Sequence, residues 1–357
     1  MTNKKHKNKQ KKELPLVSIC TPTFNRRPFI PYMIKIFNSQ TYPKDKLEWI
    51  IIDDGTDPIG DLVKDIPQVK YFYVKDKMDL GKKRNFMHSK CSGDYICYMD
   101  DDDYYPPDRV EHGIKMLMDN PKYLIAGSSL MYTYFKHINK IYSFGPYGPN
   151  HSTAATFIFK KQLLQQCKFE NTAALAEERM FLKEYTIPLL QLDSKKTILV
   201  LAHNQNTYDK KELLNKLDET RGQLTDEVIT NFISDQELLD FYTNKIDEVL
   251  DNYELGKVQH KPKVLTQIQE LKEKREKMIS DHTELASATN KIMAAFGDQN
   301  ALQLEMENMK FQFNKQLQEK NILLNQLLQR VKQQTEEIAM LKKELELLKE
   351  DKNNYVV

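Results

Sequence analysis

The stretch GDYICYMDDDDYYPPDR, from Gly93 to Arg109, joins a short apolar run to four adjacent carboxylates. Residues 95–99 are apolar or aromatic and follow Ser92-Gly93, a pattern that predicts a buried strand. The aspartates 100–103 come directly after it. Carboxylates this close repel one another, and a divalent cation such as Mg²⁺ or Mn²⁺ relieves that repulsion. An acidic run alone is typical of a solvated turn, but its position at the end of a buried strand favours a cation site.

Similar apolar runs alternate with helical patterns on either side of this stretch. Further strands are predicted over residues 14–21, 49–52, 70–74, 157–159 and 197–202, with antiparallel strands within 126–142 and helices over about 28–40, 82–89 and 175–185. The alternation indicates an α/β fold with a mostly parallel sheet covered by helices on both faces. Such sheets bind ligands at the carboxyl ends of their strands, and here those ends are polar and acidic.

The composition changes beyond about residue 211, where Lys, Glu, Gln and Leu dominate. Apolar residues recur every seven positions at Val264, Leu271, Met278, Leu285 and Ile292, and again, after a break near 297, at Leu317, Leu324, Val331, Ile338 and Leu345. This heptad pattern predicts a long helical coiled-coil region through which the chain self-associates. A single amphipathic helix that packs back on the preceding domain is the alternative.

The net charge, the cysteine spacing and the lengths of the apolar runs argue against several classes of protein. A formal net charge of +2 argues against strong attraction to nucleic acid. The lysine-rich residues 1–13 are expected to form a disordered basic tail, with anchoring to an acidic surface as the alternative. The four cysteines show neither a C-x-x-C pair nor zinc-ligand spacing. Without a signal-peptide pattern or an apolar run of transmembrane length, we expect a soluble, cytoplasmic protein.

Four segments, taken in order, resemble glycosyltransferase family 2 of the GT-A fold. They are LVSICTPTFNR (16–26), WIIIDDGTD (49–57), GKKRN (81–85) and the stretch 93–109. The resemblance covers residues 14 to about 210 and implies a GT-A-type, Rossmann-like mixed sheet there. We then expect a helical linker over 211–262, the coiled coil over 263–351 and a short tail over 352–357.

The resemblance also implies roles for individual residues. Main-chain groups of Thr21, Pro22 and Thr23 would hold the nucleotide, and Asp54 would accept a hydrogen bond from the uracil imide. Arg84 would sit beside the uridine or the diphosphate, and Asp100 would approach the ribose. Asp102 would bind the metal, with Asp101 and Asp103 as nearby alternates, and His203 would lie where many GT-A enzymes place a further metal ligand. The predicted nucleotide-sugar-binding residues are therefore Thr21, Pro22, Thr23, Asp54, Arg84, Asp100 and Asp101, and the predicted metal ligands are Asp102 and His203.

Ala176-Glu177-Glu178 resembles the family's Glu-Asp motif, which implies that Glu178 is the general base. A sugar hydroxyl is a poor nucleophile at neutral pH, so a positioned carboxylate must take its proton during attack. The family usually has Asp at this position, and the longer Glu leaves Glu177 as an alternative base. Two solvated glutamates in the first turn of a helix are the non-catalytic interpretation.

Together these features predict an inverting glycosyltransferase that uses Mn²⁺ or Mg²⁺. It would move a sugar from a UDP-sugar to a hydroxyl of a glycan or protein acceptor. One alternative is a coiled-coil scaffold whose globular half binds nucleotide-sugars without turnover. Another is a sugar nucleotidyltransferase, although Pro22 and Phe24 stand where a glycine-rich phosphate-binding loop would follow the first strand.

Overall fold

The computed structural model describes residues 13–294 except 175, and residues 305–318, 320, 334, 337 and 338. The chain divides into two compact units, Met1–Lys272 and Glu273–Val357. The predicted basic tail up to residue 12, the break near residue 297, most of the second heptad series and the tail 352–357 lie outside the described residues.

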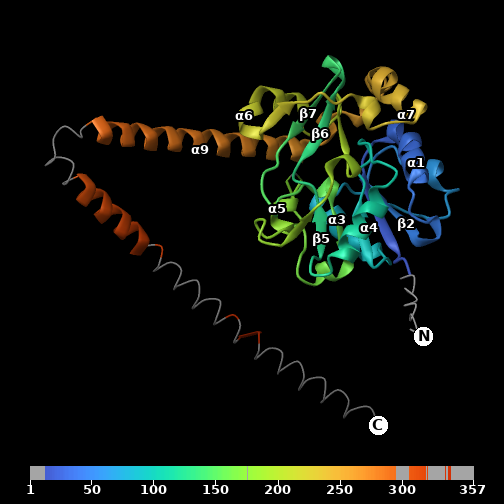
Figure 1. Cartoon of the computed structure of the whole chain (residues 1–357), viewed down its shortest axis with the longest axis horizontal. Helices are drawn as coiled ribbons and strands as arrows, with labels where there is room; N and C mark the ends of the chain where they lie inside the picture. The colour runs from blue at the N-terminus through green and yellow to red at the C-terminus, as the bar shows by residue number, and fades with distance from the viewer. Residues whose placement is uncertain are drawn as a thin grey trace, which may run out of the picture. The chain divides into compact units, whose positions relative to one another are not determined.

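A seven-stranded sheet forms the centre of the first unit within its described residues (Figure 1). Its strands, in spatial order, are β3 (Val69–Tyr73), β2 (Leu47–Asp53), β1 (Val17–Thr23), β4 (Tyr95–Tyr98), β8 (Ile158–Lys160), β5 (Ile125–Gly127) and β9 (Leu189–Gln191). The first four are parallel, β8 runs antiparallel to both of its neighbours, and β9 is parallel to β5. The fold is therefore a mixed α/β sheet, in which the predicted parallel pairing holds for β1 to β4.

Both faces of this sheet are buried, as the continuous apolar strands predict. Ile19 of β1 and Ile51 of β2 belong to one core cluster, and Cys20 and Ile50 belong to another. Alternate residues of a strand point to opposite faces, so each strand supplies both clusters. Apolar residues of α1 (Ile30–Ser39) and α4 (Arg109–Asp119) join the first cluster, and Met87 of α3 (Leu80–Lys90) joins the second.

A second sheet contains four strands within the described residues, in the order β10 (Leu199–Ala202), β6 (Met131–Phe135), β7 (Lys140–Phe144) and β11 (Gly222–Leu224). The β6–β7 pair confirms the antiparallel strands predicted within 126–142. Tyr104, just after the acidic run, exchanges backbone hydrogen bonds with Leu199 of β10 at 3.1 and 2.9 Å. This bridge brings the residue that follows β10, His203, close to the acidic run.

The segment 211–262 belongs to the first compact unit and is not a linker beside it. It contains α6 (Leu217–Thr220), β11, α7 (Gln236–Asp240) and α8 (Ile246–Asp251). Its buried residues Phe232, Ile233, Phe241, Ile246 and Leu250 join the first core cluster. The domain therefore extends well past residue 210, because these apolar side chains are buried against it.

The helix predicted over 175–185 is much shorter than expected. In the described residues α5 covers Glu178–Phe181, and Lys183, Glu184 and Tyr185 all have positive φ, which a right-handed helix does not allow. The short α2 covers Gly60–Val63. At the C-terminal side, α9 runs from Pro262 to Ala294 as one helix. None of the helices in the described part of the chain has an apolar stretch long enough to cross a bilayer.

Candidate active site

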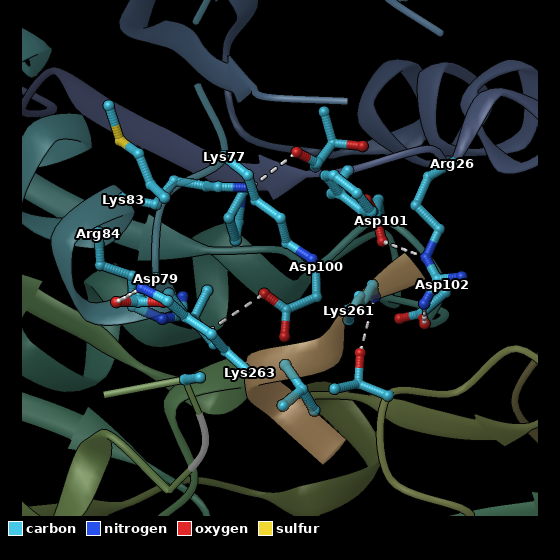
Figure 2. Close-up of a pocket in the computed structure, with 18 of the residues that line it drawn as sticks. Arg26, Lys77, Asp79, Lys83, Arg84, Asp100, Asp101, Asp102, Lys261 and Lys263 are labelled. Carbon is cyan, nitrogen blue, oxygen red and sulfur yellow. Dashed lines mark hydrogen bonds and ion pairs between the residues drawn. The ribbon is translucent and has the colours of Figure 1, made fainter. Parts of the chain in front are cut away.

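A cavity of about 310 Å³ opens at the carboxyl ends of β1 and β4 (Figure 2). Of the predicted residues, Pro22, Thr23, Arg84 and Asp100 to Asp102 line it. The rest of the lining consists of Phe24, Arg26, Lys77, Met78, Asp79, Leu80, Lys83, Ala174, Thr207, Lys261, Pro262, Lys263 and Val264. The acidic run thus faces several basic side chains across one cavity, an arrangement that suits an anion bound together with a cation.

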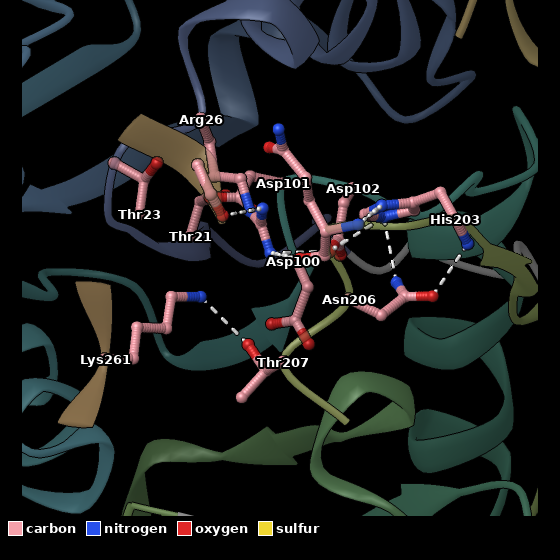
Figure 3. Close-up of polar contacts among 12 residues, drawn as sticks. Thr21, Thr23, Arg26, Asp100, Asp101, Asp102, His203, Asn206, Thr207 and Lys261 are labelled. Atoms are coloured by element: carbon pink, nitrogen blue, oxygen red, sulfur yellow. Dashed lines mark hydrogen bonds and ion pairs between the residues drawn. The ribbon is translucent and has the colours of Figure 1, made fainter. Parts of the chain in front are cut away.

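Asp102 meets His203, 101 residues later in the chain, beside this cavity. Its Oδ2 atom lies 3.2 Å from the Nε2 atom of His203 and 3.3 Å from an Nη atom of Arg26 (Figure 3). Burial opposes ionisation of Asp102, but the hydrogen bond with His203 and the charge of Arg26 together lower its pKa. Asp102 is therefore held as a carboxylate.

The other acidic residues of the run have different surroundings. Asp101 lies 3.6 Å from the Nε atom of Arg26, and burial together with the Asp102 charge raises the pKa of Asp101 to about 7. Asp103 instead accepts a hydrogen bond from the backbone N–H of Leu201 at 3.0 Å. That bond fastens the run to β10, so Asp103 supports the site and does not line the cavity.

Hydrogen bonds hold the ring of His203 in a fixed orientation beside Asp102. Its Nδ1 atom accepts a hydrogen bond from the backbone N–H of Gln205 at 3.2 Å, and its Nε2 atom lies 2.8 Å from the side-chain amide of Asn206. Burial lowers the pKa of the imidazole, which favours the neutral ring. A neutral imidazole can ligate a metal ion through the nitrogen that carries no proton. Because Nδ1 accepts a hydrogen bond here, the proton lies on Nε2, and a metal bound at Nε2 would require it to move to Nδ1.

The donor atoms of Asp102 and His203 fit a shared divalent cation, since one oxygen and one nitrogen lie close together. The described residues hold no group of three or more His, Cys, Asp or Glu side chains placed for a metal. Mg²⁺ commonly takes one or two protein carboxylates and completes its shell with substrate phosphates and water. The residues present therefore fit a metal that binds together with a phosphate-bearing substrate.

Arg84 of α3 connects the acidic run to the glutamate pair. Its Nε atom donates a hydrogen bond to Glu177 at 2.7 Å, and an Nη atom lies 3.6 Å from Asp100. The guanidinium carbon also lies 4.4 Å from the centre of the Tyr98 ring. Glu177 is thus buried in an ion pair with Arg84.

Glu178 begins α5, and the structure shows no side-chain partner for it among the described residues. Burial and the neighbouring Glu177 charge raise its pKa to about 7. A carboxylate with such a pKa is a better base than an ordinary glutamate at neutral pH. Neither glutamate lines the cavity, and Arg84 connects Glu177 to it.

Two of the predicted nucleotide-sugar-binding residues, Asp54 and Thr21, lie outside the cavity lining. Asp54 pairs with the Lys83 ammonium and accepts a hydrogen bond from the backbone N–H of Met78 at 2.7 Å. The hydroxyl of Thr21 donates to the carbonyl of Met99 at 2.7 Å and accepts from the indole of Trp49 at 2.9 Å. In this structure both side chains support the cavity wall.

Five basic residues of the cavity had no role in the sequence-based prediction: Arg26, Lys77, Lys83, Lys261 and Lys263. Arg26 and Lys83 stand inside the segments that resemble the family, so their positions offered a signal. Lys77 and Lys261 stand in ordinary lysine-containing stretches and carry no local signal. Their place in the cavity depends on contacts between distant parts of the chain.

Part of this chain is similar in sequence to known glycosyltransferases. The model of the family described as glycosyl transferase family 2 matches residues 18–185. A stretch of 120 residues, 32% of this chain, is 29% identical to an uncharacterized glycosyltransferase of Haemophilus influenzae and covers 47% of it. A stretch of 96 residues, 25% of this chain, is 32% identical to the GalNAc(5)-diNAcBac-PP-undecaprenol beta-1,3-glucosyltransferase of Campylobacter jejuni and covers 30% of it. The chain thus spans about half, or less, of the length of these curated relatives.

Among solved structures, the mannosyltransferase PcManGT from Pyrobaculum calidifontis, in complex with GDP-Man and Mn²⁺, gives a TM-score of 0.44 at 13% identity, covering 69% of this chain and 74% of that one. Staphylococcus aureus TarS 1-349 in complex with UDP-GlcNAc gives 0.41 at 17% identity, covering 53% and 59%. The family match, supported by the curated glycosyltransferases, identifies residues 18–185 of this chain as a glycosyl transferase family 2 domain.

Proposed function

We propose that this chain transfers a sugar from a UDP-sugar to a hydroxyl of a glycan or protein acceptor, with inversion at the anomeric carbon and with Mn²⁺ or Mg²⁺ bound. The observation that supports this most is the meeting of Asp102 and His203 beside a cavity lined by Arg26 and Arg84. A nucleotide diphosphate carries several negative charges, and such a cavity offers it both fixed cations and a site for a metal ion.

Donor binding would use the end of β1 and the start of the acidic run. Main-chain groups of Pro22 and Thr23 would hold the nucleotide, and Asp100 would approach its ribose. Asp101 would contact the nucleotide-sugar or serve as an alternate metal ligand. Thr21 would contribute by fixing the end of the strand. Asp54 would reach the uracil imide through a carboxylate oxygen that already accepts a hydrogen bond, since each such oxygen has two lone pairs.

The acceptor hydroxyl would attack the anomeric carbon while the bond from that carbon to the diphosphate breaks. Glu178 would remove the hydroxyl proton, since Glu177 is held in its ion pair with Arg84. A divalent ion held by Asp102 and His203 would neutralise charge on the diphosphate as it leaves. A single displacement at the anomeric carbon, assisted by one base, would invert the configuration of that carbon.

The test is metal-dependent release of UDP from a panel of UDP-sugars by the full chain, with and without acceptor glycans. We expect release with Mn²⁺ or Mg²⁺ and its loss after EDTA treatment. Full release in excess EDTA would contradict the metal role. Pyrophosphate release from UTP would favour a nucleotidyltransferase, and no release with any donor, together with stable oligomers, would favour a scaffold.

We also propose that the C-terminal helical region mediates self-association through its heptads. Leu265 and Leu271 of α9 are exposed by 41% and 48%, so this helix leaves apolar side chains uncovered in the single chain. Sedimentation velocity of the full chain tests this proposal. We expect an oligomer that Leu271→Glu weakens, and a monomer at all concentrations would contradict it.

A further inference from the structure

The segment between α8 and α9 crosses the edge of the cavity together with the first turn of α9, and we refer to residues 253–264 as the C-terminal strap. The hydroxyl of Tyr253 donates to Asp57 at 2.9 Å. The side-chain amide of Asn25 donates to the carbonyl of Leu255 at 3.0 Å. These two bonds tie the start of the strap to the loops that follow β1 and β2.

The end of the strap is tied to the loop before α3. Lys77 donates a hydrogen bond to the carbonyl of His260 at 3.0 Å, and Lys263 forms an ion pair with Asp79 at 3.1 Å. Fastened at both ends, the strap places Lys261 in the wall of the cavity (Figure 2).

Lys261 is 8% exposed, and its ammonium donates a hydrogen bond to the hydroxyl of Thr207 at 2.9 Å (Figure 3). No ion pair links this ammonium to a carboxylate of the described residues, although the charges of Asp101 and Asp102 in the same cavity act on it from farther away. Burying a charged ammonium beside a neutral hydroxyl is costly, and this burial lowers the pKa of Lys261 to about 7. An anion that joins Lys261 favours its charged form. The cavity is the side from which such an anion can arrive.

The neighbours of Lys261 narrow the chemistry of that anion. Arg26, Lys83 and Arg84 line the same cavity, but each already contacts a carboxylate, whereas the ammonium of Lys261 contacts a hydroxyl. An incoming group must therefore supply negative charge to Lys261 beside these ion pairs. A diphosphate does so, because it presents many acceptor oxygens and more than one negative charge. A neutral sugar does not.

We propose that Lys261 binds the diphosphate of the nucleotide-sugar donor, so that the C-terminal strap completes the donor site. This inference rests on the proposed function. It places a donor-binding residue 76 positions beyond the last residue matched by the family model, Tyr185. A cation held there also stabilises the negative charge that grows on the diphosphate as the sugar departs.

The experiment compares ligands with and without phosphates. The affinities of the full chain for UDP, GDP, uridine and guanosine are measured by calorimetry in the presence of Mg²⁺. Lys261→Met should weaken binding of the preferred nucleoside diphosphate by about 10- to 100-fold, the size of a lost charged hydrogen bond. Affinity for the matching nucleoside should stay unchanged, and Lys261→Arg should recover part of the loss.

Lys257→Met is the matched control. It removes the same charge from the same strap, but Lys257 is 39% exposed, pairs with Glu254 and does not line the cavity. Its nucleotide affinities should equal those of the wild type. Equal loss for the diphosphate and the nucleoside in Lys261→Met would indicate a structural role and overturn the inference.

Nucleotide binding by the wild type distinguishes failure of this inference from failure of the proposed function on which it rests. If the wild type binds a nucleoside diphosphate and Lys261→Met binds it equally well, the role of Lys261 is wrong and the proposed function stands. If the wild type binds neither UDP nor GDP, the proposed function fails and the role of Lys261 fails with it.

Discussion

The guanidinium of Arg84 and the carboxylate of Glu177 form a buried ion pair, with 2.7 Å between Nε and Oε1. Arg84 also lies over the ring of Tyr98 and lines the donor cavity. One side chain of α3 thereby holds the loop that carries the proposed base. Charge balance in the core and the position of Glu178 therefore depend on the same contact.

Arg84→Met should destabilise the protein by about 3–5 kcal/mol, because it leaves Glu177 buried without its cation. Urea unfolding at neutral pH measures this. The double variant Arg84→Met/Glu177→Gln should be less destabilised than Arg84→Met alone, since residue 177 then carries no buried charge without a partner. Equal stability of Arg84→Met and the wild type would show that the pair is unimportant.

Asp102→Asn should lower metal-dependent UDP release by about 100-fold or more, because an amide is a much weaker ligand for Mn²⁺ or Mg²⁺ than a carboxylate. The metal concentration needed for half-maximal rate should rise as well, and His203→Gln should shift it in the same direction. Asp94→Asn changes an exposed aspartate before β4 and serves as the control. Unchanged turnover in Asp102→Asn would contradict the proposed metal site.

The rate should depend on pH through Glu178, whose pKa is raised from its ordinary value of 4.5 to about 7. Below pH 7 the side chain holds a proton and cannot act as a base, so log kcat/KM should rise with pH and level off above about 7. Glu178→Gln should abolish turnover, while Glu178→Asp should retain part of it. A flat profile between pH 5 and 8 would assign the base elsewhere.

Ionisation of Glu178 should raise the rate but lower the stability of the folded protein as the pH rises. The folded state keeps the Glu178 proton to a higher pH than the unfolded state does, so this side chain contributes stability below about pH 4.5 that is lost as the pH rises towards 7. Glu178→Gln should therefore unfold at higher urea than the wild type at pH 8 and at similar urea at pH 4. A constant difference between the two proteins across this range would contradict the raised pKa.

Gly256→Ala should displace the C-terminal strap from the loop that carries His203. A Cβ atom at this position would lie 1.9 Å from the Oε1 atom of Gln205, whose amide nitrogen donates to the carbonyls of Leu250 and Tyr253 at 2.7 Å each. Overpacking of this kind costs about 1–3 kcal/mol. We expect lower stability by urea unfolding and a raised KM for the donor. Gly148→Ala, where the nearest atom is 3.9 Å away, is the control and should change neither.

The parallel strands β1 to β4 and the acidic edge of the site could be predicted from the sequence. Runs such as Trp49 to Ile52 are apolar and β-branched, and local composition of that kind is sufficient to predict a buried strand. The aspartates after β4 follow such a run, so their place at a carboxyl end could be predicted from local order alone. The short α5 could not, because the positive φ angles of residues 183–185 have no local residue signal such as glycine.

Tertiary structure alone decided which distant residues meet at this edge. His203 reaches Asp102 through the pairing of Tyr104 with Leu199, and Lys261 reaches the cavity because the strap is bonded to loops more than 180 residues earlier. The apolar side chains of residues 229–250 recur at intervals typical of amphipathic helices, a pattern that does not say what covers them. In the structure they are buried in the first unit. Local pattern specifies which face of an element is apolar, whereas the choice of partner for that face depends on the packing of the whole chain.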